Sequence, residues 1–265
     1  MGRVVLVTGA SAGLGRATAD LLAQQGWTVV GASRRGSGGP GWQGLVMDVD
    51  SDESVAAGVQ RVLSDHGRVD ALVAAAGWGL AGPAETTSLA EARAQLETNF
   101  WGTVRVTTGL LPHLRANGGG RVVLISSIGG LIAIPFQSYY SASKFALEGW
   151  AEALAYEVAP FNVGVTLVEP GNFRTDFTAN RRDAAGPSGP YEAALRHAIA
   201  VMERDERNGA DPVAVARVVA RQLQADTPRR RVSVGKPGER VGLVAKRLLP
   251  HRWFEAAAKD ALGVQ

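Results

Sequence analysis

Short apolar runs alternate along the chain with longer stretches in which apolar residues recur every three or four positions. The short runs predict strands at residues 3–8, 28–32, 44–47, 70–75, 120–126, 163–168 and 231–234. The longer stretches predict helices at residues 14–25, 52–65, 89–116, 138–158 and 211–224. Such alternation is typical of a parallel sheet with helices on both faces, so we expect an α/β fold.

Two stretches interrupt this pattern. Residues 36–44 are rich in Gly and Pro and predict a loop, and residues 183–190 with their neighbours predict a long irregular insertion. The sequence shows no internal repeat and no linker between domains. A chain of 265 residues suits one domain that buries roughly three quarters of its unfolded surface. We therefore expect residues 1–265 to form a single domain.

The first predicted strand leads into a glycine-rich turn. After the apolar run 4–7 the chain reads Thr-Gly-Ala-Ser-Ala-Gly-Leu-Gly, and a helical stretch follows from Arg16. Gly9, Gly13 and Gly15 allow a tight turn and a close approach of the backbone to a pyrophosphate. The N–H groups at the start of the helix would face the charge of that group, so the turn is a candidate phosphate site.

A serine and a Tyr-x-x-x-Lys step lie close together in the second half of the chain. Ser127 precedes Tyr140 by thirteen residues, and Lys144 follows Tyr140 at position i+4. On a helix, Tyr140 and Lys144 project from one face, so an ammonium can lie near the phenol. This cation, with a second one from an oxidised nicotinamide ring, would lower the phenol pKa from about 10 toward neutral pH. The segment therefore predicts a proton-transfer site for carbonyl and alcohol chemistry.

Together the two segments resemble the short-chain dehydrogenase/reductase family, in its shorter single-domain branch with a TGxxxGxG turn and a YxxxK site. The resemblance covers about residues 3–235 and implies a doubly wound, Rossmann-like parallel sheet of about seven strands. It also identifies an adenine-contacting pair, an active-site asparagine and a nicotinamide loop. The implied cofactor-binding residues are Gly9, Ser11, Gly13, Leu14, Gly15, Arg34, Asp48, Val49, Ala75, Gly77, Tyr140, Lys144, Pro170, Gly171 and Thr175.

The resemblance implies catalytic roles for four residues. Ser127 would hydrogen-bond the substrate oxygen, and Tyr140 would give that oxygen a proton as hydride reaches the carbon. Lys144 would lower the pKa of Tyr140 and hold the nicotinamide ribose, and Asn99 would anchor a water that connects Lys144 to solvent. Ser126 competes for the serine role, and the thirteen-residue spacing to Tyr140 favours Ser127.

One position departs from the family pattern. Residues 74–77 read Ala-Ala-Ala-Gly where the family usually has Asn-Asn-Ala-Gly. Without these amide side chains, the hydrogen bonds that usually hold the preceding strand in place are in doubt. The catalytic chemistry depends on them much less.

The end of the second predicted strand bears on the choice of cofactor. An NAD-selecting protein would place a carboxylate there for the ribose diol, and this chain has Ser33. Arg34 instead offers a guanidinium to a 2′-phosphate, with help from Ser11 in the glycine turn. The competing interpretation is a solvated arginine pair that merely ends the strand. We expect NADP(H) as the cofactor.

The predicted substrate pocket is apolar. Its expected lining residues are Trp78, Ile128, Ile134, Phe173 and Phe177, and residues 176–210 are expected to act as a substrate lid. An apolar lining favours a small hydrophobic carbonyl or alcohol, and residues 127–149 are similar to hydroxysteroid and retinol dehydrogenases. Two other functions stay open. One is a 3-oxoacyl thioester reductase, and the other is a non-catalytic NADP(H) sensor, which would not need the catalytic residues.

Composition limits the setting of this chemistry. The chain has no cysteine, which excludes disulfides and thiolate metal sites, and its four histidines show no ligand spacing, so we expect no metal. No apolar run reaches about 18 residues, which excludes an ordinary membrane span. A strand is predicted directly after Arg3, so we expect no signal peptide and a cytoplasmic protein.

Residues 236–265 are predicted to form an amphipathic tail. Val241, Val244, Ala245, Leu248 and Leu249 recur at helical spacing, and residues 229–260 hold nine Lys or Arg against three acidic residues. We expect the apolar stripe to pack on its own domain or on a sister subunit. The alternative is weak contact with an anionic membrane or an acidic carrier. The charge is local and no nucleic-acid-reading motif accompanies it, so we expect no nucleic-acid partner.

A stripe of small residues predicts an oligomer. Ala142, Ala146, Gly149 and Ala153 share one face of the predicted helix 138–158. Small side chains permit the close approach of a helix from another subunit, so we expect a homodimer or homotetramer. The competing interpretation is that this stripe faces the protein's own sheet.

Overall fold

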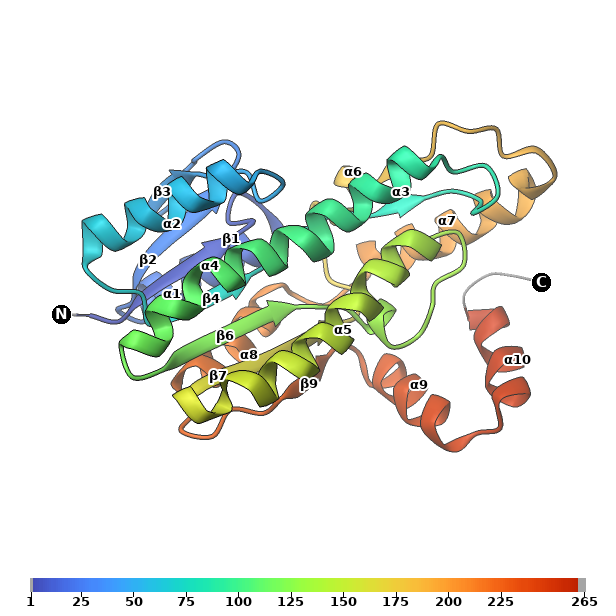
Figure 1. Cartoon of the computed structure of the whole chain (residues 1–265). Helices are drawn as coiled ribbons and strands as arrows, with labels where there is room; N and C mark the ends of the chain where they lie inside the picture. Colours follow the sequence, from blue (N-terminus) through green and yellow to red (C-terminus); the bar gives the residue numbers. More distant parts are fainter. Residues whose placement is uncertain (1, 262–265) are drawn as a thin grey trace.

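Seven parallel strands form the central sheet. In the computed structural model, which describes residues 2–261, the strands are ordered β3-β2-β1-β4-β6-β7-β9 (Figure 1). Their bounds are β1 Val4–Thr8, β2 Thr28–Ser33, β3 Gln43–Val46, β4 Ala71–Ala74, β6 Gly120–Ile125, β7 Val163–Pro170 and β9 Arg231–Val234. Every neighbouring pair runs parallel. The predicted Rossmann-like sheet of about seven strands is confirmed.

Helices cover both faces of this sheet (Figure 1). Their bounds are α1 Gly13–Gln24, α2 Asp52–His66, α4 Gly102–Ala116, α5 Ser138–Val158 and α8 Val213–Gln224. Along β1, Val4 and Leu6 pack toward α2, α4 and α5, whereas Val5 and Val7 pack toward α1 and α8. All four valine and leucine side chains are buried because each face of the sheet has its own helical layer.

The strand order reverses between β1 and β4. From β1 the chain moves outward to β2 and β3, then returns to place β4 on the other side of β1. Loops that follow these neighbouring strands diverge at their carboxyl ends and leave a crevice there. The glycine turn after β1 and the loops after β4, β6 and β7 therefore meet at one edge of the sheet.

The predicted helix 89–116 is divided into two helices. α3 covers Leu89–Leu96, a π-helical turn covers Glu97–Trp101, and α4 continues from Gly102. Asn99 lies inside the π-helical turn and is completely buried. A π-helical turn widens the backbone by one residue and is frequent at functional sites.

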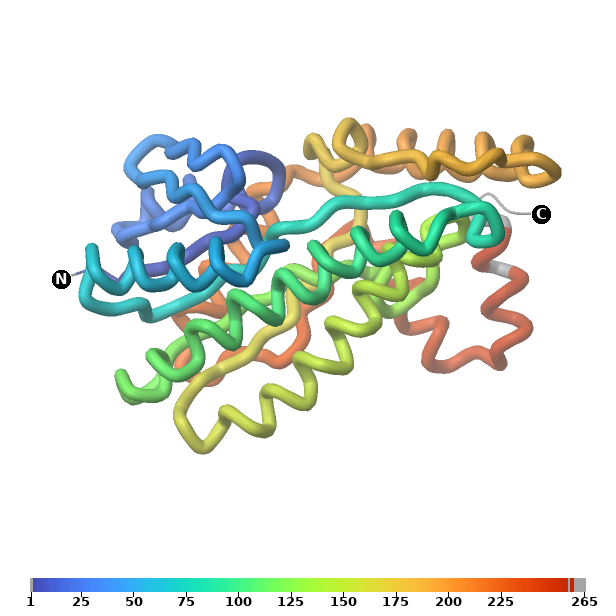
Figure 2. Tube along the Cα trace, turned by 45° about the horizontal axis from the view of Figure 1, so that its top comes forward, coloured from blue at the N-terminus to red at the C-terminus, as the bar shows by residue number. Residues whose placement is uncertain are grey.

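Two regions lie outside the predicted sheet and its covering helices. In the first, α6 Phe177–Asn180 precedes β8 Arg182–Asp183, which pairs with β5 Leu80–Ala81, and α7 Glu192–Arg207 follows. In the second, the tail forms α9 Pro237–Leu248 and α10 His251–Ala261. Figure 2 shows α7 in orange and the tail in red as separate segments beyond the same end of the sheet. The last four residues of the predicted tail, 262–265, lie outside the described residues.

The small-residue stripe of α5 points away from the sheet. Ala142, Gly149 and Ala153 are exposed, and a Cβ added to Gly149 would meet no atom within 4 Å in the described structure. The opposite face of α5 carries the buried Leu147 and Leu154. The interpretation that the stripe faces the protein's own sheet is therefore wrong.

The apolar stripe of the tail is divided between two faces of α9. Val241, Val244 and Leu248 are 65%, 56% and 76% exposed, so they do not pack on the described part of the chain. Ala245 on α9 and Leu249, the residue after its end, instead line the cavity described below. The expectation that the stripe packs on its own domain therefore holds only for this second face. None of the helices within residues 2–261 is long and apolar enough to cross a membrane.

Candidate active site

A cavity of about 870 Å³ opens at the carboxyl ends of the central strands. The loops after β1, β2, β4, β6 and β7 form its inner wall, and parts of α6, α7, α9 and α10 form its outer wall. Every residue predicted to bind cofactor or substrate lines this cavity, as do Ser127, Tyr140 and Lys144. Segments more than a hundred residues apart in the sequence thus contribute to one site.

The glycine turn after β1 fits a bound pyrophosphate. Gly9 and Gly13 have positive φ angles of 67° and 55°. A Cβ on Gly9 would lie 2.7 Å from the Ala75 carbonyl oxygen, and one on Gly15 would lie 2.4 Å from the Gly9 carbonyl oxygen, so larger residues do not fit. The first turn of α1 has no acidic residue, and Ala12 before it has no side-chain acceptor for the N–H groups of the helix. These N–H groups and the positive end of the helix dipole suit an anion.

Strand β2 ends without a carboxylate. Ser33 is buried, and its Oγ accepts a hydrogen bond from the Gly36 N–H at 3.1 Å. Arg34 lines the cavity and is exposed. The neighbouring Arg35, which was not predicted from the sequence, is also exposed and lines the cavity. Asp48 and Val49 lie in the same part of the wall.

Thr8 braces the strand that lacks the usual asparagines. Its Oγ1 accepts hydrogen bonds from the Ala75 N–H at 3.1 Å and from the Ala76 N–H at 3.3 Å. The end of β4 is therefore tied to the end of β1 despite the alanines at 74–76. The adjoining Gly77 lines the cavity.

Ser127 and Tyr140 converge around Gly129. A Cβ on Gly129 would lie 3.1 Å from Tyr140 Cε1 and 3.2 Å from Ser127 Oγ, so glycine makes room for both side chains. Ser127 Oγ also accepts a hydrogen bond from the Gly129 N–H at 2.9 Å. Ser126, the competing serine, also lines the cavity, and its buried Oγ has no hydrogen-bond partner among the described residues. The geometry thus places Ser127 Oγ next to the phenol of Tyr140.

Burial has opposite effects on the two titratable groups of the YxxxK step. It raises the pKa of Tyr140 to about 12, against a smaller lowering by a hydrogen bond with Ser127, and the charge of Glu206 raises it further. Burial lowers the pKa of Lys144 to about 8, while the charge of Glu148 opposes this. Lys144 Nζ lies 6.0 Å from the Tyr140 ring centre and donates a hydrogen bond to the Ile125 carbonyl at 2.9 Å. That Lys144 lowers the pKa of Tyr140 when the cofactor is bound stays a prediction.

Asn99 lies behind the cavity wall. Its Oδ1 accepts from the Trp78 N–H at 3.0 Å, and its Nδ2 donates to the Trp78 carbonyl at 3.0 Å and to Ser143 Oγ at 3.1 Å. A Cβ on Gly77 would lie 3.0 Å from Asn99 Oδ1 and 3.8 Å from Lys144 Nζ. The absence of a side chain at Gly77 therefore leaves room for both of these side chains. The asparagine therefore fixes the loop after β4 beside Lys144.

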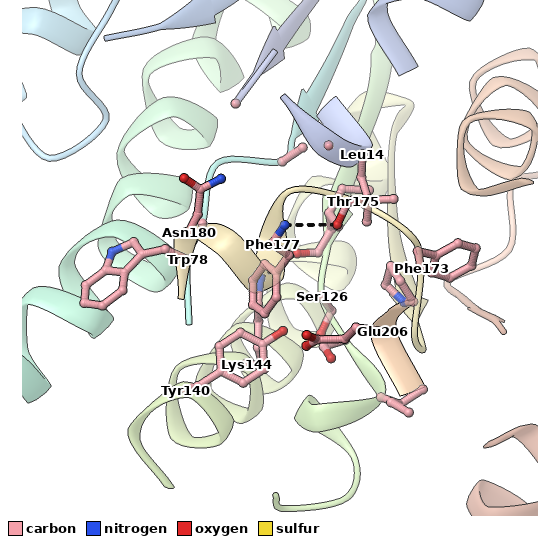
Figure 3. Close-up of a pocket in the computed structure, with 18 of the residues that line it drawn as sticks. Leu14, Trp78, Ser126, Tyr140, Lys144, Phe173, Thr175, Phe177, Asn180 and Glu206 are labelled. Carbon is pink, nitrogen blue, oxygen red and sulfur yellow. Dashed lines mark hydrogen bonds between the residues drawn. The ribbon is translucent and has the colours of Figure 1, made fainter. Parts of the chain in front are cut away.

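The apolar side of the cavity contains the predicted substrate residues. Phe177 packs edge to face on Tyr140, with ring centres 5.7 Å apart (Figure 3). Phe173 lines the cavity but also belongs to the hydrophobic core, where it is 5% exposed. The sequence reasoning missed further lining residues, namely Gln137, Val201, Met202, Asp205, Glu206, Gly238, Glu239, Gly242, Phe254 and Ala258. Apart from Gln137, these residues belong to segments 192–207 and 237–258, whose helical spacing was the available signal.

Comparisons with known proteins agree with this geometry. Residues 3–186 match the sequence model of the short chain dehydrogenase family. The chain is 39% identical to 3-ketodihydrosphingosine reductase of Bacteroides thetaiotaomicron over 97% of each chain. It is 36% identical to estradiol 17-beta-dehydrogenase 1 of Rattus norvegicus over 85% of this chain and 71% of the rat protein. A crystal structure of a short-chain dehydrogenase from Streptomyces avermitilis superposes with a TM-score of 0.84 at 33% identity, covering 98% of this chain and 95% of that one.

The low pKa of Lys144 predicts a pH-dependent stability. With a folded-state pKa of about 8 against 10.5 for the unfolded chain, the unfolded state takes up the proton first as pH falls. Wild type should therefore lose about 3 kcal/mol of unfolding free energy between pH 10.5 and pH 8, relative to Lys144→Met. Urea unfolding of both proteins across this range measures the difference. Parallel stability curves would contradict the assigned environment of Lys144.

Proposed function

This chain belongs to the short chain dehydrogenase family, and we propose that it is an NADP(H)-dependent oxidoreductase for the carbonyl or secondary alcohol of a hydrophobic substrate. Oxidoreductase chemistry on carbonyl and alcohol groups is common to the family. The observation that carries the finer proposal is the meeting of Ser127, Tyr140 and Lys144 in a cavity with apolar walls and a glycine turn.

The bound nicotinamide would supply or accept the hydride. At pH 7 the phenol of Tyr140 carries its proton, since its pKa is about 12, and it donates that proton to the substrate oxygen during reduction. Ser127 Oγ lies beside the phenol and stabilises the negative charge that develops on the same oxygen. Lys144 would hold the nicotinamide ribose and support proton transfer, and Asn99 keeps the loop after β4 in place beside it.

The lining of the cavity supports a hydrophobic substrate. Ile128, Ile134 and Phe177 lie on the wall next to Tyr140, and Leu249 and Phe254 of the tail complete it. The relative from Bacteroides carries the name of a reductase for a ketone, 3-ketodihydrosphingosine. We propose ketone reduction as the reaction. A 3-oxoacyl thioester reductase is the alternative, with the basic tail as contact for an acidic carrier, and a non-catalytic sensor would not need the complete catalytic set.

We also propose that two segments cover the bound substrate, the lid of residues 176–210 and the tail from residue 236. Asp176, Phe177 and Val201 of the lid and Ala245 and Leu249 of the tail all line the cavity. Together with the central sheet these segments would form the single domain expected from the sequence. Binding of cofactor and substrate should slow amide hydrogen exchange in both segments. Exchange that is unchanged by ligands would instead identify them as fixed parts of the fold.

The surface of α5 supports a homodimer or homotetramer. Phe145 and Tyr156 are 41% and 61% exposed beside the small residues Ala142, Gly149 and Ala153. Small residues flanked by exposed aromatic side chains suit close packing against a second copy. Light scattering is expected to give the mass of at least two chains. A monomer at micromolar concentration would contradict this proposal.

The outer face of α9 supports weak contact with an anionic membrane. Val241, Val244 and Leu248 are exposed there, and the exposed Arg240 and Arg247 belong to the same helix. Flotation with anionic vesicles should recover part of the protein, and Val244→Glu with Leu248→Glu should abolish this. Equal recovery with neutral vesicles would argue against a role for the charge. The cytoplasmic location expected from the sequence stays a prediction that cell fractionation can test.

The proposed reaction predicts NADPH oxidation with lipophilic ketones. In an absorbance assay across ketones, aldehydes, steroids and oxoacyl thioesters, long-chain ketones should have the highest kcat/KM. Tyr140→Phe removes only the proton donor, so turnover should fall by about 100-fold or more while NADPH binding is retained. Tyr139→Phe is the matched control and should keep most activity. A Tyr140→Phe protein with more than about a tenth of the wild-type rate would exclude the assigned role.

The end of β2 predicts a preference for NADPH. Ser33→Asp combined with Arg34→Gln removes the partner of the 2′-phosphate and adds an acceptor for the ribose diol, so the preference should shift toward NADH by about tenfold or more. The ratio of kcat/KM for the two cofactors measures the shift. Arg61→Gln, an exposed arginine outside the cavity wall, is the control. A wild-type preference for NADH would refute the assignment.

A further inference from the structure

The carboxylate of Glu206 lies in the same part of the cavity as the catalytic tyrosine. Glu206 is at the carboxyl end of α7, and it lines the cavity together with Met202 and Asp205 of that helix. Figure 3 shows Glu206 near Ser126 and the hydroxyl end of Tyr140. Its charge acts on the phenol, since it raises the pKa of Tyr140. Glu206 thus brings a carboxylate close to the reaction centre.

Glu206 is held in place from outside the cavity. The side chain of Arg181 is 3% exposed and does not line the cavity, and its Nη1 lies 3.2 Å and 3.3 Å from the two carboxylate oxygens of Glu206. Thr178 Oγ1 donates a further hydrogen bond to Oε2. A carboxylate accepts about four hydrogen bonds, so capacity is left for a ligand in the cavity. The orientation of the group is fixed before any ligand binds.

The side chains that face the cavity in this region include three carboxylates, those of Asp176, Asp205 and Glu206. The arginines that pair with them do not line the cavity: Arg181 contacts Glu206, and Arg204 lies 3.2 Å from Asp205. Arg181 also contacts Glu203, which pairs in turn with Arg207 at 3.3 Å. Among the cationic side chains that line the cavity, Arg34 and Arg35 belong to the adenine end, Lys144 donates to the Ile125 carbonyl, and Arg182 stacks on the Trp78 ring at 4.4 Å. A half-buried carboxylate that faces a cavity beside other carboxylates is stabilised by a cation in that cavity.

We propose that Glu206 recognises a protonated amino group on the carbon next to the reacting carbonyl, so that the substrates are lipophilic α-amino ketones. This inference rests on the proposed ketone reduction. Ser127 and Tyr140 act on the carbonyl oxygen, Glu206 accepts hydrogen bonds from the ammonium, and the hydrocarbon chain extends along Ile134, Phe177 and the tail. The two polar contacts fix which face of the ketone meets the cofactor.

The amino group would also assist the chemistry. The Glu206 charge disfavours ionisation of Tyr140, and an ammonium that pairs with Glu206 offsets this effect. A bound amino ketone would therefore meet a more acidic phenol than a plain ketone does. The expected signature is a higher kcat as well as a lower KM for the amino ketone.

The test compares three ketones of equal chain length with NADPH and the full-length protein. They are an α-amino ketone, its N-acetyl derivative and the plain ketone. Wild type should prefer the α-amino ketone over both others, and in Glu206→Gln the ratio of kcat/KM for amino ketone to plain ketone should fall by about 10- to 100-fold. Glu203→Gln is the matched control, because Glu203 also contacts Arg181 but does not line the cavity, and the ratio should stay within about threefold of wild type.

A second variant guards against a folding defect. Glu206→Asp keeps the charge and should retain most of the preference, and NADPH binding reports whether each variant is folded. Equal losses for all three ketones in Glu206→Gln, or a wild type without preference, would overturn the inference and leave ketone reduction intact. A wild type that reduces none of the three ketones would instead overturn the proposed function, and this inference with it.

Discussion

Parallel pairing of the seven strands is the constraint on which the site depends. Because all strands run in one direction, the loops after β1, β4, β6 and β7 leave the sheet at one edge. The glycine turn, Gly77, Ser127 and Pro170 are therefore neighbours in space although they span most of the chain. The interior of the sheet is mostly apolar, and the polar groups of the site lie at the carboxyl ends of the strands, where they can meet ligands and water.

A line of buried polar groups continues from this edge along α5. Tyr140, Lys144 and Glu148 follow one another at helical spacing and are all buried. Glu148 accepts a hydrogen bond from Arg231 Nε of β9 at 3.0 Å, so the line ends in an ion pair with the edge strand of the sheet. Burial moves the pKa of Tyr140 up and that of Lys144 down, yet both groups keep their protons at pH 7. The ligand-free protein is thus set up as a proton donor.

The central sheet and its helices could be predicted from the sequence, because each strand is a nearly continuous apolar run and each covering helix has an apolar stripe. The two motifs and the family that they resemble predicted most of the residues that line the inner wall of the cavity. The apolar residues within 192–207 recur at the spacing of an amphipathic helix and indicate α7. The many charged residues in this segment and the Gly/Pro-rich stretch before it made the pattern difficult to recognise. The π-helical turn at Asn99 could not be predicted, since it depends on contacts with Trp78 and Ser143 that exist only in the folded chain. The same is true of Glu206, whose place is set by Arg181.

The contact between the tail and the nicotinamide loop has an evolutionary consequence. Glu239 Oε1 accepts hydrogen bonds from the Asn172 N–H at 2.9 Å and from Asn172 Nδ2 at 2.8 Å, and a Cβ on Gly171 would lie 2.2 Å from Glu239 Oε2. Any side chain at position 171 would thus displace the carboxylate that fixes the start of α9. Positions 171 and 239 should therefore vary together among related sequences: lineages that keep a glutamate at 239 retain glycine at 171, and lineages that lose the glutamate are released from that restriction.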